Sequence, residues 1–399
     1  MNRIAAIVGL VAATDALAQE ARVIQIPSHP TYGQLIPRSI SGDGRVVIGY
    51  GLGGGRPTPM AWTIDGEIDV CLSPAFGNNG GSGSVSSYDG SIVAGTTSAA
   101  GQVGFRWVRG GSTTLLTGLS GQGNLRSSVA ISRDGSIVGG DSTWGNAAYW
   151  TAQGGVVRIP GIPGANSRTV SGMSADGQTM VGLLIGGAPF AWRAGQGSFL
   201  VPMPPGMIIP SNLSVTANGD ALVGSAYSNV VGVGVPFIWN ADTGSSILPG
   251  VPGQAKTMIG DGSADARIAV GQTYANPTPP YGDAGVAVFT IGTGTQYLAD
   301  ILQEFGLSHA RNDFGVSISV SDDGMTIVGK NGIHPYWVVV LPQPELADYN
   351  IDRTVDFLDM VDYVDCYTGN SILPVSSADL DHDGAVDFFD YDEFVRRFE

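Results

Sequence analysis

Cysteine, histidine and basic residues are all scarce in this chain of 399 residues. The two cysteines, Cys71 and Cys366, lie far apart in the sequence, which excludes a framework of several disulfides and leaves open one long-range bridge. The 19 lysines and arginines face 35 acidic residues, whereas a surface that neutralises nucleic-acid phosphates needs abundant positive charge. The shortage of basic residues therefore argues against a nucleic-acid partner.

Recognisable catalytic motifs are missing as well. The four histidines show no metal-ligand spacing, and the chain has no phosphate-binding loop, nucleophile elbow or Cys–His arrangement. Whether the protein is an enzyme stays open on these grounds, but the sequence favours a protein that binds without catalysing.

Long apolar runs are absent, and one short run stands out at the N-terminus. Arg3 precedes an apolar segment over residues 4–13, and Ala16-Leu17-Ala18 offers small residues at the positions that signal peptidase reads. About ten apolar residues cannot form a membrane anchor, which needs about 20. We expect residues 1–18 to be a signal peptide and the mature chain to be secreted or held at the cell surface, without a transmembrane segment.

Negative charge is concentrated in the C-terminal part of the chain. From Glu345 onward there are 15 acidic and 3 basic residues, a net charge of −12, whereas the preceding part carries 20 acidic and 16 basic residues, a net charge of −4. This distribution indicates cation binding in the tail.

Glycine, in contrast, is abundant, and many of the 60 glycines belong to a pattern that recurs seven times. The pattern is Ser-x-Asp-Gly, three or four apolar or small residues, and then Gly, with a later aromatic residue that is Trp in six copies. The copies cover residues 41–49, 87–95, 132–140, 174–182, 216–224, 263–271 and 321–329. The Asp, Gly and Trp positions are interpreted as turn formers and packing residues.

The spacing of the copies predicts a fold. Asp-Gly or Asn-Gly between apolar runs indicates a hairpin with a type I′ turn, in which both central residues have positive φ. Repeats of about 45 residues with about four short strands each are typical of propeller blades. We therefore predict an all-β, seven-bladed β-propeller over residues 19–341, and a solenoid of stacked hairpins is the alternative.

The chain termini of this region favour a closed ring. Residues 23–27 resemble the last strand of a unit, as found at residues 157–160, whereas the final unit stops after residues 337–341 without such a strand. The N-terminal strand is expected to complete the last blade, which would leave no open sheet edge.

The repeat resembles a known family. Ser-x-Asp-Gly-x-x-Val-Val-Gly followed by Ala-Phe-x-Trp, as at residues 188–192, is similar to the HAF family of extracellular repeats. Residues 297–302 also look like the helical insertion that precedes the final repeat of that family. The resemblance covers roughly residues 22–342 and implies a location outside the cell, with no assigned activity.

Two acidic segments near the C-terminus share one spacing of oxygen-bearing residues. Both offer side-chain oxygens at loop positions 1, 3, 5, 9 and 12 and a backbone carbonyl at position 7, as in a twelve-residue EF-hand-type calcium loop. The first set is Asp348, Asn350, Asp352, Thr354, Asp356 and Asp359, and the second is Asp379, Asp381, Asp383, Ala385, Asp387 and Asp390. A solvated acidic face would not repeat one register twice, so we predict two Ca²⁺ sites.

A helix is expected after each loop and none before it. Each helix should have one apolar face, formed by Phe357, Val361 and Val364 in the first and by Phe388, Tyr391, Val395 and Phe398 in the second. Tandem loops with exit helices only resemble a dockerin, most closely the variant found in secreted planctomycete proteins. The resemblance covers residues 347–399, after a Pro-containing linker at 342–346, and implies a cohesin-like or cell-surface partner.

Two departures from the dockerin pattern concern affinity and partner choice. Arg353 stands where glycine normally permits a left-handed turn, so the first loop is expected to bind calcium more weakly than the second. The positions that resemble the partner-reading pair hold Phe357-Leu358 and Phe388-Phe389, where dockerins often carry small polar residues. An apolar contact with the partner is therefore expected.

The propeller offers weaker candidates for a second binding surface. Loops after the Val-Val-Gly strands should project on one face and carry Tyr50, Trp144, Tyr227, Tyr274 and Tyr281. These aromatics could bind a polysaccharide or a protein, and the alternative is that each one caps its own blade. Asp220, Asp261 and Asp313 lie outside the turn pattern and are the acidic candidates for lining the central channel.

Together these patterns predict a secreted, non-enzymatic binding or scaffold protein that is anchored through a calcium-dependent module. The alternative is a component of an extracellular polysaccharide-degrading assembly, with hydrolase or carbohydrate-binding activity in the propeller.

Overall fold

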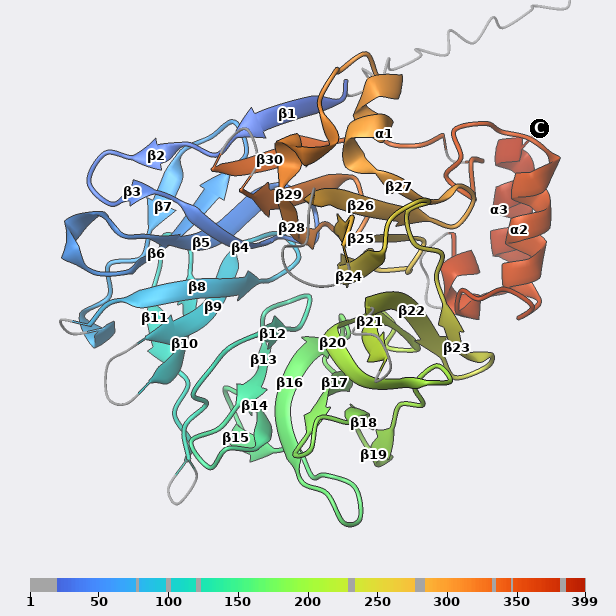
Figure 1. Cartoon of the computed structure of the whole chain (residues 1–399). Coiled ribbons are helices and arrows are strands. Elements are labelled where there is room, and N and C mark those ends of the chain that lie inside the picture. Colours follow the sequence, from blue (N-terminus) through green and yellow to red (C-terminus); the bar gives the residue numbers. More distant parts are fainter. Residues whose placement is uncertain are drawn as a thin grey trace, which may run out of the picture.

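The computed structural model describes residues 20–76, 79–97, 102–119, 123–228, 234–276, 284–331, 335–345, 347–380 and 385–398. Seven four-stranded antiparallel sheets stand radially around a central axis (Figure 1). This arrangement is a seven-bladed β-propeller, so the predicted fold class of the main body is confirmed and the solenoid alternative is wrong.

Each blade follows its predecessor in the chain, with its first strand on the axis. Blade 1 contains β4 (Ile36–Ile40), β5 (Val46–Gly51), β6 (Thr58–Thr63) and β7 (Ile68–Val70), and blade 2 contains β8 (Gly81–Ser86), β9 (Ile92–Thr97), β10 (Val103–Val108) and β11 (Thr113–Leu115). Blade 3 contains β12 (Ala130–Ile131), β13 (Ile137–Asp141), β14 (Ala147–Thr151) and β15 (Gly155–Arg158), and blade 4 contains β16 (Ser167–Met173), β17 (Thr179–Leu184), β18 (Pro189–Arg193) and β19 (Gly197–Leu200).

The last three blades have the same order. Blade 5 contains β20 (Met207–Val215), β21 (Ala221–Ser228), β22 (Gly234–Asn240) and β23 (Gly244–Ile247), and blade 6 contains β24 (Lys256–Gly262), β25 (Ile268–Tyr274), β26 (Ala284–Thr290) and β27 (Gly294–Tyr297). Blade 7 contains β28 (Val316–Val320), β29 (Thr326–Lys330), β30 (Tyr336–Val340) and β1 (Arg22–Gln25). A short extra hairpin of β2 (Ser28–His29) and β3 (Gly33–Gln34) follows β1.

The N-terminal strand closes the ring, as expected from the sequence. β1 pairs antiparallel with β30, from Arg22 opposite Val340 to Gln25 opposite Trp337. Blade 7 is thus built from both ends of the propeller segment, which removes the open edge that a three-stranded last blade would present.

The Ser-x-Asp-Gly turns are held by side-chain hydrogen bonds. In blade 1 the Ser41 hydroxyl donates to Asp43 Oδ1 at 2.6 Å and accepts from the N–H of Val46 at 2.9 Å. In six of the turns the glycine has positive φ, +71° at Gly44, and in the blade 6 turn Ala266 has it, at +63°. The preceding aspartate or asparagine does not, so the predicted type I′ geometry is wrong. The aspartate instead accepts from the N–H two residues later, which builds the turn from its carboxylate.

The final glycine of the pattern faces an irregularity in the first strand of its blade. In six blades β-bulges interrupt the pairing of the first two strands, for example between Ile259 and Asp261 in blade 6. A Cβ atom on Gly271 would lie 1.7 Å from the carbonyl oxygen of Met258. No other residue fits there, which explains why glycine ends each copy.

The recurring aromatics fill the core between blades, as interpreted from the sequence. Trp62, Trp107, Trp150, Trp239, Phe289 and Trp337 are buried, and Trp192 is half-buried. Both cysteines are buried and free, so the long-range bridge does not form.

Three α-helices accompany the propeller in the described residues. α1 (Leu298–Glu304) lies before blade 7, where a helical insertion was expected, and α2 (Phe357–Tyr367) and α3 (Phe388–Phe398) follow the two acidic loops. Short 3-10 turns occur at Gly53–Gly55, Pro74–Phe76, Arg311–Phe314 and Val375–Ala378. None of the helices in the described residues is long and apolar enough to cross a membrane.

The C-terminal helical segment packs against blades 5 and 6 (Figure 1). Asn240 Nδ2 donates to the carbonyl of Ile372 at 2.9 Å, and the N–H of Gly292 donates to the carbonyl of Asn350 at 2.8 Å. Ser377 donates to the carbonyl of Asp265 at 2.6 Å. The contacts come from the turn face, which we define as the face that carries the Ser-x-Asp-Gly turns.

The apolar face expected for α2 is exposed to solvent. Phe357, Val361 and Val364 are 36–69% exposed, whereas Tyr363 and Cys366 are fully buried. The side of α2 that packs on α3 and the propeller therefore carries Tyr363 and Cys366, which helical periodicity alone does not indicate.

Substituting turn glycines should separate backbone strain from steric overlap. Gly110 and Gly135 have φ of +68° and +69°, but a Cβ would meet nothing within 4 Å at Gly110 and lie 2.8 Å from Ile92 Cδ1 at Gly135. We expect Gly110→Ala to lower the free energy of unfolding by about 1 kcal/mol and Gly135→Ala by about 2–3 kcal/mol. Urea denaturation of both variants checks this, and equal losses would contradict the packing argument.

Candidate functional site

A ring of backbone hydrogen bonds surrounds the axis at the turn face. The second residues of the seven turns are Gly42, Tyr88, Arg133, Ala175, Ala217, Ala264 and Asp322. The N–H of each donates to the carbonyl of the next, except that Asp43 donates in place of Gly42, with seven N···O distances of 2.7–2.9 Å. The ring fixes the mouth of the central channel.

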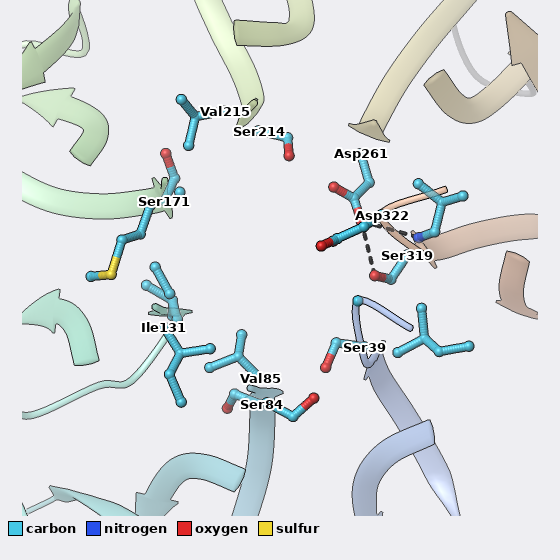
Figure 2. A pocket seen from close by; sticks show the side chains of 18 of the residues that line it. Ser39, Ser84, Val85, Ile131, Ser171, Ser214, Val215, Asp261, Ser319 and Asp322 are labelled. Carbon is cyan, nitrogen blue, oxygen red and sulfur yellow. Dashed lines mark hydrogen bonds between the residues drawn. The ribbon is translucent and has the colours of Figure 1, made fainter. Parts of the chain in front are cut away.

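The channel below this ring is a cavity of about 610 Å³, lined by the first strands of all seven blades. Figure 2 shows serines and apolar side chains mixed around its wall. Val85 lies beside Ser84 and Val215 beside Ser214, and Asp261, Asp322 and Ser319 lie together on one side.

Asp261 is a fixed part of the wall, and among the three acidic candidates for the channel it is the one that lines the cavity. Its Oδ2 accepts from the Ser319 hydroxyl at 2.8 Å and from the N–H of Val320 at 3.1 Å, and its Oδ1 accepts from the N–H of Gly262 at 3.0 Å. Burial raises the pKa of Asp261, although these hydrogen bonds oppose the rise. Asp220 instead accepts from Thr216 in its turn, and Asp313 caps a 3-10 turn.

Three side chains meet at the channel mouth above Gly42. Arg133 lies with its Cζ 3.6 Å from the centre of the Tyr88 ring, and its Nη1 is 3.8 Å from Asp322 Oδ2. A Cβ on Gly42 would lie 2.5 Å from Tyr88 and 2.6 Å from Asp322, so glycine leaves room for the cluster. We call Tyr88, Arg133 and Asp322 the mouth cluster.

Sequence reasoning missed the mouth cluster because it treated the second turn position as unconstrained. The sequence did contain a signal for the cluster: at this position three blades carry alanine, whereas three others carry the larger polar residues Tyr, Arg and Asp. Burial raises the pKa of Asp322 to about 6, although nearby Arg133 opposes the rise. About 41% of the Asp322 side chain remains exposed.

The first acidic loop is closed by its own hydrogen bonds. Asp359 is fully buried and accepts from the N–H of Asn350 at 3.1 Å and of Asp356 at 2.8 Å. Asp348 accepts from the N–H of Asp352 at 3.0 Å and of Arg353 at 2.9 Å. These bonds direct the carboxylates of positions 1 and 12 toward the loop interior.

Other predicted ligands of the first loop lie nearby in the same turn. Asp352 accepts from the N–H of Thr354 at 2.9 Å, and Asp356 accepts from the N–H of Leu358 at 2.7 Å to cap α2. Burial raises the pKa of Asp348, and the neighbouring carboxylates of Asp359 and Asp352 add to the rise while backbone hydrogen bonds oppose it.

The second loop repeats part of this arrangement. Asp390 is buried and accepts from the N–H of Leu380 at 2.7 Å and of Asp387 at 2.8 Å, and Asp387 caps α3 through the N–H of Phe389. Asp379 is buried and Ala385 is exposed, whereas Asp381 and Asp383 lie outside the described residues. Within the described ranges, no three His, Cys, Asp or Glu side chains form a group that could hold a metal, so both Ca²⁺ sites stay predictions.

Arg353 adopts the left-handed conformation that its loop position was expected to require, with φ of +71°. Its guanidinium forms an ion pair with Glu304 of α1 and lies 4.9 Å from the centre of the Phe305 ring. Arginine in place of glycine at this loop position therefore adds a stabilising contact, because Arg353 links the first loop to α1 of the propeller region.

The four predicted partner-reading residues are exposed. Phe357, Leu358, Phe388 and Phe389 have 56–69% of their surface accessible to solvent. Tyr363 and Phe394, at equivalent positions of the two repeats, are buried and stack with ring centres 4.3 Å apart. We call the exposed residues the helix-start pairs.

The predicted aromatics of the propeller have different surroundings. Tyr50 packs with Arg38, and Trp144 is 48% exposed in the turn at 142–145. The Nζ atom of buried Lys256 lies 4.9 Å from the ring centre of Tyr227 and 5.6 Å from that of Tyr274. Tyr281 lies outside the described residues, and a binding role for these residues stays a prediction.

Replacing Asp322 should reveal its raised pKa in the pH dependence of stability. The folded state favours the protonated carboxyl of Asp322, so the free energy of unfolding is highest below about pH 4 and falls as pH rises through about 6. We expect Asp322→Asn to stabilise the protein by roughly 1 kcal/mol at pH 8, allowing for solvent screening of an exposed group, and to be neutral at pH 3.5.

Asp89→Asn is the matched control in thermal unfolding from pH 3.5 to 8. The pKa of Asp89 is lowered by hydrogen bonds from Ser91, so this variant should lose stability at neutral pH and approach the parent protein in acid. A destabilised Asp322→Asn variant at pH 8 would contradict the assignment.

Comparisons with known proteins support the fold. No protein-family model matches the chain, and no curated protein sequence does. An oligogalacturonate lyase in complex with manganese has a TM-score of 0.54 at 13% identity, covering 81% of this chain and 94% of its own. An oligogalacturonate lyase from Vibrio parahaemolyticus has a TM-score of 0.55 at 12% identity, covering 82% and 98%. At such low identity the likeness shows a shared seven-bladed β-propeller and nothing about activity.

Proposed function

We propose that this protein is a secreted, non-enzymatic scaffold or binding protein, which is joined to an extracellular or cell-surface assembly through its C-terminal calcium loops and helices. The observation that carries the proposal is the exposure of the helix-start pairs, Phe357-Leu358 and Phe388-Phe389, at equivalent positions in both repeats. Large apolar side chains gathered on an exposed surface favour a protein partner.

The packing of the helices supports a surface that is free for a partner. Tyr363 stacks on Phe394, and the ring centres of Tyr367 and Tyr391 are 6.3 Å apart. The later residue of α2 thus pairs with the earlier residue of α3, so the two helices run antiparallel and share an aromatic core. The hydrogen bonds to the propeller come from Tyr349, Ile372 and Ser377, which lie outside α2 and α3. The helix-start pairs serve neither contact, and a dockerin-like role in binding a cohesin-like partner accounts for them.

The donor set of the two loops favours calcium over other metals. Carboxylate, amide and carbonyl oxygens are hard ligands, and no thiolate or imidazole shares their register. In the first loop, Asp348, Asn350, Asp352, Asp356 and Asp359 would hold the ion, with the carbonyl of Thr354. Bound Ca²⁺ would neutralise the clustered carboxylates and fix the orientation of α2.

Calcium titration of the mature full-length chain should give two binding events of unequal affinity. The weaker event is expected in the first loop, because left-handed φ at Arg353 costs about 1 kcal/mol relative to glycine. In isothermal calorimetry, Asp348→Ala should remove the weaker event and Asp379→Ala the stronger one. Absence of both events in the parent chain would refute the calcium proposal.

Docking should depend on calcium and on the helix-start pairs. We expect a purified cohesin domain to bind the full chain in calcium but not in EGTA, as measured by biolayer interferometry. The double variant Phe388→Ser, Phe389→Ser should weaken binding at least about tenfold, since burying one Phe is worth about 1.5–3 kcal/mol.

Ile185→Ser provides the control, because Ile185 is 58% exposed on the propeller and lies outside the calcium loops. Equal loss in this control would point to a general effect of surface apolarity. Unchanged binding by the Phe388 and Phe389 double variant would remove the helix-start pairs from the interface.

A further inference from the structure

We propose that the central channel is a binding site for a neutral pyranose sugar, one or two rings long, which enters past the mouth cluster. This inference is independent of the calcium loops. Its first support is size, since the cavity of about 610 Å³ falls within the range of about 300–1,000 Å³ that small-molecule sites occupy.

The second support is the mixed wall. A pyranose ring has C–H groups on its faces and hydroxyls around its edge, so it can contact apolar and hydrogen-bonding side chains at once. Val85 and Val215 line the cavity beside Ser84 and Ser214, and Asp322 and Ser319 lie across it from Ile131 (Figure 2). A ligand that is polar all round would leave the apolar side chains poorly covered.

The third support is unused hydrogen-bonding capacity. Ser39 and Ser86 are among the lining residues, and in the described part of the chain the hydroxyl of each is buried without a hydrogen-bond partner. A buried hydroxyl without a partner costs about 1–3 kcal/mol, and rotation of the serine side chain toward the cavity would let a ligand hydroxyl recover this cost by donating to it or accepting from it. Asp261 is already saturated by its neighbours and serves as wall.

Charge at the mouth selects a neutral ligand. Arg133 and Asp322 lie 3.8 Å apart, so the entrance carries one group of each sign. An anion would meet Asp322 and Asp261, and a cation would meet Arg133 and Arg38, which also lines the cavity. A neutral polyol meets neither repulsion, and its vicinal hydroxyls can donate to the exposed Asp322 carboxylate.

The test uses the mature full-length chain and a panel of neutral monosaccharides and disaccharides of glucose, galactose, mannose and xylose, with their uronic acids and amino sugars as charged comparisons. Calorimetry and saturation-transfer NMR should detect a neutral sugar with a dissociation constant of about 0.1–1 mM and one site per chain. The affinity should be the same in calcium and in EGTA, which separates this site from the docking proposal.

Two substitutions locate the site. Ser84→Phe fills the channel and should weaken binding at least about tenfold, whereas Ser246→Phe on outer strand β23 should leave it unchanged. Ser39→Ala adds no volume and should weaken binding about threefold to tenfold through one lost hydrogen bond, even if Ser84→Phe fails to fold. Circular dichroism and melting temperature report folding.

Three results would overturn the proposal. The first is no binding by any neutral sugar of the panel at 10 mM, a concentration about tenfold above the weakest affinity expected. The second is binding that persists unchanged in Ser39→Ala and in folded Ser84→Phe. The third is selective binding of the charged sugars alone.

Discussion

Seven backbone hydrogen bonds running from turn to turn around the axis constrain the rest of this molecule. Six of them start from the second residue of a turn and one from Asp43, the third residue of the first turn, and the bond from Asp322 to the carbonyl of Gly42 returns to the start. Such a ring closes only if every blade has the same tilt and the same turn geometry. The serine and aspartate side chains that build each turn therefore act on the whole ring, because they hold these N–H and carbonyl groups in position.

Closure at the axis is matched by closure at the rim. β1 completes blade 7, so the first and last strands of the propeller hold each other, and the tail leaves from the same blade. The tail then crosses the turn face to blades 5 and 6, where Arg267 donates to the carbonyl of Tyr349 and Arg353 pairs with Glu304. The calcium loops are thus attached to the most constrained surface of the molecule, and the position of the first loop is coupled to α1.

Much of this fold follows from local chemistry that a sequence displays. Asp-Gly turns, strand-length apolar runs and an N-terminal strand without a partner predict seven blades and their closure, because each signal acts within a few residues. The mouth cluster could not be predicted in this way, since Tyr88, Arg133 and Asp322 come from three blades and meet only after closure. The same holds for the buried side of α2, because helical periodicity places Phe357 and Tyr363 equally well, and the propeller and α3 decide which is covered.

The division of apolar surface in the tail argues for a second protein. Tyr363 and Phe394 form the core between the helices, and the segments around Tyr349 and Ile372 bind to the propeller. The helix-start pairs add nothing to either contact, although burying each side chain would gain about 1.5–3 kcal/mol. Nothing in the stability of this chain requires four large apolar residues in solvent at equivalent positions of a duplicated unit. Both repeats carry large apolar residues at these positions, Phe-Leu in the first and Phe-Phe in the second. A surface that binds a partner requires such residues, whereas folding of this chain does not.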